Sequence, residues 1–183
     1  GCAEIVKSAV IDSDNFFFWL ADAAARLADR DEQVTKEAIT RSVVFKSNIV
    51  ARDVMESKGV RECLNYGHTL GHAIETLAGY GTFSHGQAVA EGMRFAARLG
   101  AALVGTSVEL IDTQDALLDS LGLPTISWKA EPDALLDAMK GDKKVKQGRL
   151  RFVLPEDVGT WQIVEVPAEV VLEHLNAWCG ARP

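Results

Sequence analysis

Apolar residues recur three and four positions apart along most of this chain, and this spacing is what most constrains how the chain can fold. Residues at such intervals share one face of a helix, so the pattern predicts amphipathic helices. We expect helices over 3–11, 16–28, 35–50, 60–78, 87–104, 107–121 and 132–140. Asn15 and Thr35 are the expected N-caps of the second and third helices, and Gly79 and Gly100 are expected to stop or kink the fourth and fifth.

The pattern changes after Gly141, where β-branched and aromatic residues partly alternate over 149–154 and 160–166. A turn containing proline and glycine separates the two segments, which predicts a β-hairpin. A proline then opens a last helix, roughly 168–178. We therefore expect one mainly α domain over 1–183, with many helices and a small C-terminal β-hairpin.

Composition narrows the classes of partner. The formal net charge of -7 argues against a nucleic-acid surface, and no apolar stretch reaches the ~18 residues that would cross a membrane. Three cysteines without paired spacing favour a reducing compartment, so we expect a cytoplasmic protein. The first residues resemble the interior of a longer protein rather than a signal peptide. Dinucleotide and P-loop glycine motifs are absent from the sequence, so a nucleotide cofactor would be bound mainly outside this chain.

Three of the four histidines fall close together, at His68, His72 and His85. We expect 61–75 to form one helix, on which five polar residues share an arc of about 80°: Arg61, Asn65, His68, His72 and Glu75. A solvated helix face is the ordinary explanation of such a stripe. Arginine, asparagine and histidine are nevertheless unlike the usual Lys/Glu mixture, and two glycines four residues apart would let a ligand or another backbone approach. We therefore favour a functional site.

His68 and His72 have the spacing of a zinc protease motif, but Thr69 stands where that motif requires glutamate. His85 is a better partner because it precedes a strongly helical run. The positive end of a helix dipole favours the neutral imidazole, which is the form that binds metal. The alternative is that His85 only caps the helix.

Glu4 and Lys7 lie one turn apart on the first expected helix, where such a pair is most often a surface ion pair. Together with two histidines, Glu4 would complete the His/His/Glu composition of an open catalytic zinc site, although spacing alone does not bring it to them.

A basic, glycine-bounded loop at 141–149 contains Lys143 and Lys144. It is either a solvated loop or one whose lysines close over a phosphate.

The block Leu64-Asn65-Tyr66-Gly67-His68-Thr69-Leu70-Gly71-His72-Ala73-Ile74-Glu75 resembles the signature of the 3-dehydroquinate synthase family. Further segments match the family in order: Gly1-x-Ala3-Glu4-Ile5-Val6-Lys7, Arg41-Ser42-Val43…Lys46, His85-Gly86-Gln87-Ala88-Val89-Ala90 and Asp142-Lys143-Lys144. The resemblance covers essentially the whole chain. It implies the C-terminal helical half of a two-domain enzyme whose N-terminal NAD-binding domain is absent from this chain.

The resemblance also implies the roles of individual residues. Glu4, His68 and His85 would bind zinc (or cobalt). The substrate, 3-deoxy-D-arabino-heptulosonate 7-phosphate of the shikimate pathway, would be contacted by Lys7, Lys46, Arg61, Asn65, His72 and Lys143 or Lys144, with His72 and Lys46 as catalytic residues. Val54-Met55-Glu56 stands where Glu-x-Glu is common in the family, so Glu56 is given no role. The family commonly forms homodimers. The alternatives are another sugar-phosphate cyclase such as 2-deoxy-scyllo-inosose synthase, and a non-catalytic zinc-binding module.

Overall fold

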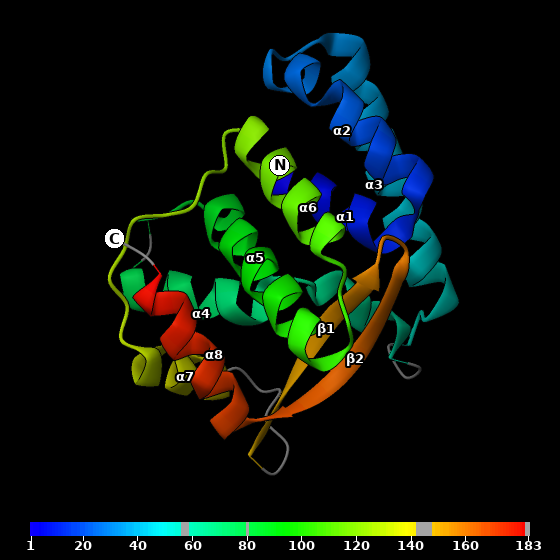
Figure 1. Ribbon diagram of the computed structural model, residues 1–183. Coiled ribbons are helices and arrows are strands. Elements are labelled where there is room, and N and C mark those ends of the chain that lie inside the picture. The colour runs from blue at the N-terminus through cyan, green and yellow to red at the C-terminus, as the bar shows by residue number, and fades with distance from the viewer. Residues whose placement is uncertain (56–58, 80, 142–147, 182–183) are drawn as a thin grey trace.

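The computed structural model describes residues 1–55, 59–79, 81–141 and 148–181 (Figure 1). It confirms a mainly helical domain that ends in a β-hairpin and one more helix. The elements are α1 (Cys2–Asp12), α2 (Asp14–Ala28), α3 (Glu32–Arg52), a 3₁₀ helix (Val60–Asn65), α4 (His68–Ala78), α5 (His85–Leu103), α6 (Val108–Ser120), α7 (Pro132–Gly141), β1 (Arg149–Asp157), β2 (Thr160–Pro167) and α8 (Ala168–Gly180).

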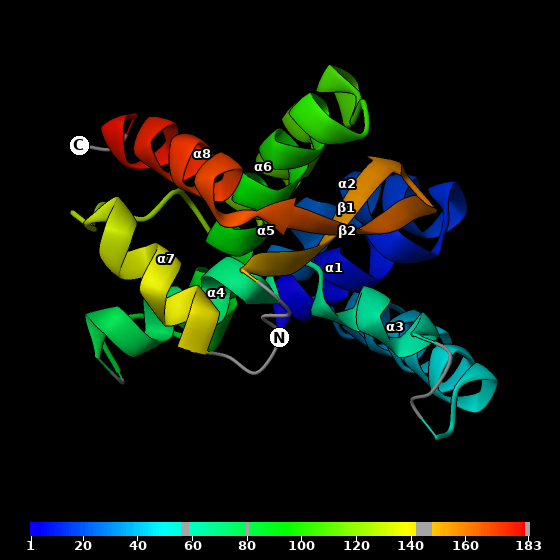
Figure 2. The same ribbon diagram turned by 90° about the horizontal axis from the view of Figure 1, so that it is seen from below.

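Helix α5 lies at the centre of the molecule, in contact with α4, α1, α6 and β1. Figures 1 and 2 show α2 and α3 at one end, α7 and α8 at the other, and the hairpin running between the two ends. Small residues let the neighbours of α5 approach closely. A Cβ atom at Gly92 would overlap the carbonyl oxygen of Gly67, at the start of α4. This close contact holds α4 directly against α5.

The expected continuous helix over 60–78 is wrong. A 3₁₀ helix ends at Asn65, Gly67 adopts a left-handed conformation with φ 78°, and α4 begins at His68. The ideal Cβ position of Gly67 lies 2.8 Å from the carbonyl oxygen of Val89, so the break is fixed by packing on α5 that the sequence pattern does not reveal. Arg61 and Asn65 therefore precede α4 and do not extend its polar face.

A buried polar network fastens the start of α4 to the core. The Tyr66 side chain is fully buried, and its hydroxyl donates a hydrogen bond to Gln114 Oε1 on α6 at 2.6 Å. Burial raises the pKa of this hydroxyl, so it stays protonated and remains a donor. Glu91, buried on α5, accepts a hydrogen bond from the Ile126 amide at 2.9 Å. The Tyr66 bond sets the position of the chain segment that leads into His68, and the Glu91 bond ties the segment after α6 to α5.

Three helix boundaries differ from expectation. The N-cap positions of α2 and α3 are Ser13 and Asp31, not Asn15 and Thr35. Asp31 Oδ1 accepts a hydrogen bond from the Val34 amide at 3.0 Å, which is ordinary N-cap geometry. Gly100 lies inside α5, where a side chain would overlap the Thr106 hydroxyl.

Two expected boundaries are confirmed. Gly79 is the C-cap of α4, with φ 82°. Pro167 is the N-cap of α8.

The hairpin is antiparallel, as expected, with Arg151 opposite Glu165. Its turn docks on the first helix, because the Gly159 amide donates a hydrogen bond to the Val10 carbonyl at 2.8 Å. Arg151 also pairs with Glu62 at 3.0 Å and so connects β1 to the 3₁₀ helix. Among the described residues, no helix has the length and apolar character needed to cross a membrane.

Candidate metal centre

Glu4 lies in the first turn of α1, and its two carboxylate oxygens face different neighbours. Lys7, one turn later, donates to Glu4 Oε2 at 2.7 Å and to the Leu64 carbonyl at 2.7 Å. Lys7 is buried, which lowers its pKa, and the nearby Lys46 ammonium lowers it further, whereas Glu4 favours the charged form. The lysine thus holds one oxygen of Glu4 and leaves Oε1 directed toward the imidazoles.

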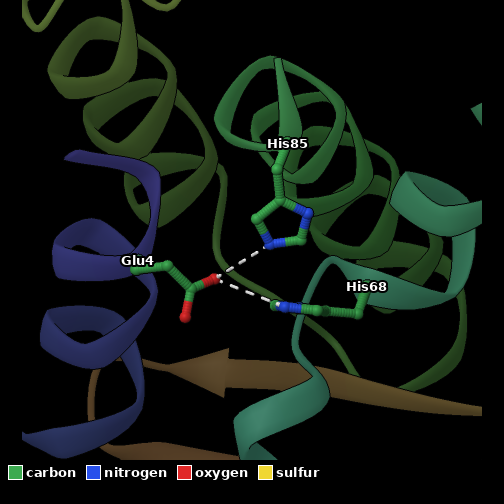
Figure 3. A group of neighbouring side chains, drawn as sticks. All are labelled: Glu4, His68 and His85. Atoms are coloured by element: carbon green, nitrogen blue, oxygen red, sulfur yellow. Dashed lines mark ion pairs between the residues drawn. The ribbon is translucent and has the colours of Figure 1, made fainter. Parts of the chain in front are cut away.

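His68 is the first residue of α4, and its ring uses both nitrogens. Nδ1 lies 3.0 Å from the carbonyl oxygen of Tyr66, and Nε2 lies 3.3 Å from Glu4 Oε1. The side chain is 12% exposed, so its direction is fixed by the surrounding protein. Figure 3 shows the ring pointing toward Glu4 from the helix opposite α1.

His85 is the first residue of α5. It is not the cap of that helix, because Ser84 is the N-cap and forms a capping box with Gln87. The His85 Nδ1 atom lies 3.1 Å from Glu75 Oε1, and its Nε2 atom lies 3.9 Å from Glu4 Oε1. The side chain is 48% exposed, which makes this the open side of the cluster.

These three side chains converge from three helices (Figure 3). Their ligand atoms all lie within 4.8 Å of one another, and Glu4 Oε1 is buried without a hydrogen-bond partner in the described part of the chain. Zinc bonds of roughly 2.0–2.2 Å in tetrahedral geometry imply ligand atoms about 3.3 Å apart. Two imidazoles and one carboxylate, whose Oε1 atom faces them, therefore fit a divalent metal with an open coordination position.

Glu4 is the acidic member of the cluster. Burial raises the pKa of this carboxyl group, but its interactions with His68 and Lys7 outweigh burial and lower the pKa to about 2. Glu4 is therefore a carboxylate across the neutral range. A carboxylate is the form that binds a metal ion.

His72 lies one turn beyond His68 on α4 and beside the three ligand side chains. Its ring centroid is 5.3 Å from that of His68 and 6.3 Å from that of His85. It lines a cavity of about 490 Å³ between α4 and the end of α7, together with Thr69 and Gly141. The cavity is large enough for a phosphate group.

Three more of the residues proposed from the sequence lie on α3 and on the 3₁₀ helix. Lys46 is exposed on α3 and close enough to Lys7 to affect its pKa. Arg61 and Asn65 lie on the 3₁₀ helix, where the Arg61 amide is 3.5 Å from Asp53 Oδ2. Lys143, Lys144 and Glu56 lie outside the described residues.

Sequence reasoning gave no role to three contacts that hold the candidate ligands. The carbonyl groups of Leu64 and Tyr66 are backbone atoms, which no side-chain pattern identifies. The sequence places Glu75 on the polar arc, but its contact with His85 depends on the turn between α4 and α5, which the pattern does not specify.

Solved structures of other proteins share this fold and indicate its class. A 2-epi-5-epi-valiolone synthase from Streptomyces hygroscopicus subsp. jinggangensis, with NAD+ and Zn2+ bound, superposes with a TM-score of 0.83 at 20% identity, over 97% of this chain and 50% of that one. A 2-deoxy-scyllo-inosose synthase complexed with carbaglucose-6-phosphate, NAD+ and Co2+ gives 0.73 at 25% identity, over 96% and 49%. The fold is that of one half of a sugar-phosphate cyclase.

Sequence comparison identifies the family within this class. A family model described as "3-dehydroquinate synthase C-terminal" matches residues 1–145. The 3-dehydroquinate synthases of Rhodopirellula baltica and Nitrosomonas europaea are 45% and 40% identical over 100% and 97% of this chain. The chain belongs to the 3-dehydroquinate synthase family. It spans 49% and 48% of those two proteins, about half their length.

Proposed function

We propose that this chain is the metal- and substrate-binding half of a 3-dehydroquinate synthase. The whole enzyme would convert 3-deoxy-D-arabino-heptulosonate 7-phosphate to 3-dehydroquinate and phosphate, by NAD-dependent oxidation, phosphate elimination, reduction and intramolecular aldol closure. The observation that carries the proposal is the convergence of Glu4, His68 and His85 within 4.8 Å. A preceding NAD-binding half is supported by curated relatives that are twice as long.

A zinc ion with three protein ligands would hold substrate hydroxyl groups and polarise a carbonyl group at its open position. The residues of this chain would then orient the substrate around that position. His72 faces the cavity beside the cluster and would hydrogen-bond the phosphate or carry a proton. Lys46 would act with it as a second catalytic residue.

The other proposed substrate contacts are cationic or amide side chains. Arg61 presents a planar fork that suits a carboxylate or phosphate group. Asn65, Lys7 and a lysine of the pair Lys143–Lys144 would supply further donors. Because Lys7 already bonds Glu4 and Leu64, we expect its main effect on the reaction to be through the position of Glu4.

Two alternative functions predict different results in metal-binding and substrate-binding measurements. A 2-deoxy-scyllo-inosose synthase would have the same metal ligands and a different sugar. The 45% identity to a 3-dehydroquinate synthase, against 25% to the inosose synthase, supports the first assignment. A non-catalytic zinc-binding module would bind metal but not a phosphorylated sugar acid.

The deciding experiment is zinc stoichiometry on the metal-replete, desalted chain. We expect about one zinc per wild-type chain, and loss of zinc in Glu4→Ala, His68→Ala and His85→Ala. His174→Ala, which changes the histidine on α8, is the control and should retain zinc. A folded wild-type chain that holds no zinc would contradict the proposed centre, and so would full retention in any of the three ligand variants.

A further inference from the structure

The two histidines of the candidate centre each use their second ring nitrogen within the protein, and their partners differ. His68 Nδ1 lies against the main-chain oxygen of Tyr66, at 3.0 Å. His85 Nδ1 lies against a side-chain carboxylate oxygen, Glu75 Oε1, at 3.1 Å. The ring of His68 is therefore positioned by a main-chain oxygen, which a side-chain substitution does not remove. The ring of His85 is positioned by a single side chain, that of Glu75.

The contact with Glu75 selects one tautomer of His85. A carboxylate only accepts hydrogen bonds, so the ring nitrogen beside it must carry the proton. A neutral ring with its proton on Nδ1 has its lone pair on Nε2. Nε2 is the atom that faces Glu4 Oε1 at 3.9 Å, so the lone pair points into the centre.

The position of His85 explains why such a partner is needed. Its side chain is 48% exposed and belongs to the first residue of α5, directly after a loop. Glu75, in contrast, is 23% exposed on α4, two turns from His68 on the same helix. Helix α4 thus carries a candidate ligand, His68, and also the side chain that contacts a second candidate ligand on another helix.

We propose that Glu75 is a positioning residue of the metal centre, which fixes the tautomer and ring direction of His85 without touching the metal. This inference rests on the proposed function, because it assumes that His85 is a ligand. Carboxylate–histidine–metal arrangements of this kind raise the basicity of the ligand and restrict its rotation, and their loss typically lowers metal affinity ~10–100-fold.

The first test is zinc affinity, measured by competition with a chromophoric chelator on the whole chain. We expect Glu75→Ala to weaken zinc binding ~10–100-fold. Glu75→Gln should lose less, because its amide oxygen still accepts the Nδ1 proton. Glu173→Ala, an exposed glutamate on α8, is the matched control and should bind as the wild type does. The melting temperatures of the metal-free variants should match that of the wild type.

Two results would overturn the inference. Equal zinc affinity in Glu75→Ala and the wild type would show that His85 needs no such partner. Complete loss of zinc in both Glu75→Gln and Glu75→Ala, as in His85→Ala, would show that Glu75 is itself a ligand.

A second readout does not depend on metal. Nitrogen-15 NMR of the metal-free chain at alkaline pH reports which ring nitrogen of each histidine carries the proton. We expect His85 to be protonated on Nδ1 in the wild type and in Glu75→Gln, and to become a mixture of tautomers in Glu75→Ala. A wild-type His85 protonated on Nε2 would overturn the inference. If the wild type shows the Nδ1 tautomer but binds no zinc, the proposed function fails and the role of Glu75 in orienting the ring stands.

Discussion

Glu4 divides its two carboxylate oxygens between different neighbours, and that division organises the candidate centre. Oε2 is bonded by Lys7, which is itself anchored on the Leu64 carbonyl, while Oε1 faces His68 and His85. A carboxylate with one oxygen fixed has little freedom left to rotate. Such an ion pair, taken alone, is most often a surface pair, but the Glu4–Lys7 pair lies in the candidate centre and holds a candidate ligand in place.

Substitution of His72 tests whether metal binding and phosphate binding depend on different residues. We expect His72→Ala to retain about one zinc per chain, because its ring lies beside the cluster and outside the group of three ligand atoms. Its affinity for inorganic phosphate, measured by calorimetry on the zinc-loaded chain, should fall ~10-fold or more through the loss of a charge-assisted hydrogen bond. Zinc loss as large as in His68→Ala would show that the ligands have been wrongly chosen.

Cys63 should be chemically inert in the folded chain. It is fully buried in the 3₁₀ helix, and burial raises the pKa of its thiol to about 11, although Lys7 opposes the shift. Because alkylation requires the thiolate, iodoacetamide at mildly alkaline pH should label Cys2 and Cys179, which are half-buried, before Cys63. Mass spectrometry of the native and urea-unfolded chain would measure this. Equal labelling rates in the native chain would contradict the burial of Cys63.

At the scale of elements, sequence periodicity predicted the helices well where one helix face packs on the core, and failed where two backbones meet. Tyr66 and Gly67 continue the helical pattern, yet the chain breaks there because Gly67 contacts α5. A pattern of apolar residues contains no information about that contact. The partnership of Glu75 with His85 was missed for a similar reason, since it depends on the turn between α4 and α5. The candidate ligands themselves were found by resemblance rather than by spacing.

The close packing of α4 on α5 can be tested with Gly92→Ala. The added methyl group would overlap the Gly67 carbonyl oxygen, so α4 would have to move. We expect the free energy of unfolding, measured in urea, to fall by about 1–3 kcal/mol or more. Zinc affinity should fall with it, because His68 follows Gly67 directly. Gly180→Ala is the control, since its Cβ position meets no atom within 4 Å and alanine favours a helix. Unchanged stability in Gly92→Ala would contradict the contact.

At the scale of the whole molecule, the chain places its candidate metal ligands on α1, α4 and α5, and both α1 and α4 contact α5. It contains no dinucleotide-binding glycine motif, and it spans about half the length of its curated relatives. We therefore propose that metal binding and substrate orientation belong to this half, and that hydride transfer would use a cofactor site in the other half of the longer protein.

That division predicts the behaviour of the chain in an assay. Supplied with zinc, NAD and 3-deoxy-D-arabino-heptulosonate 7-phosphate, the chain alone should release phosphate no faster than a control without NAD. Elimination requires prior oxidation of the neighbouring hydroxyl group, and this needs NAD held against the substrate. The full-length Rhodopirellula baltica relative, assayed in parallel, tests the substrate and the conditions. NAD-dependent phosphate release by the chain alone would show that its own residues bind the dinucleotide and that the two activities are not divided between halves.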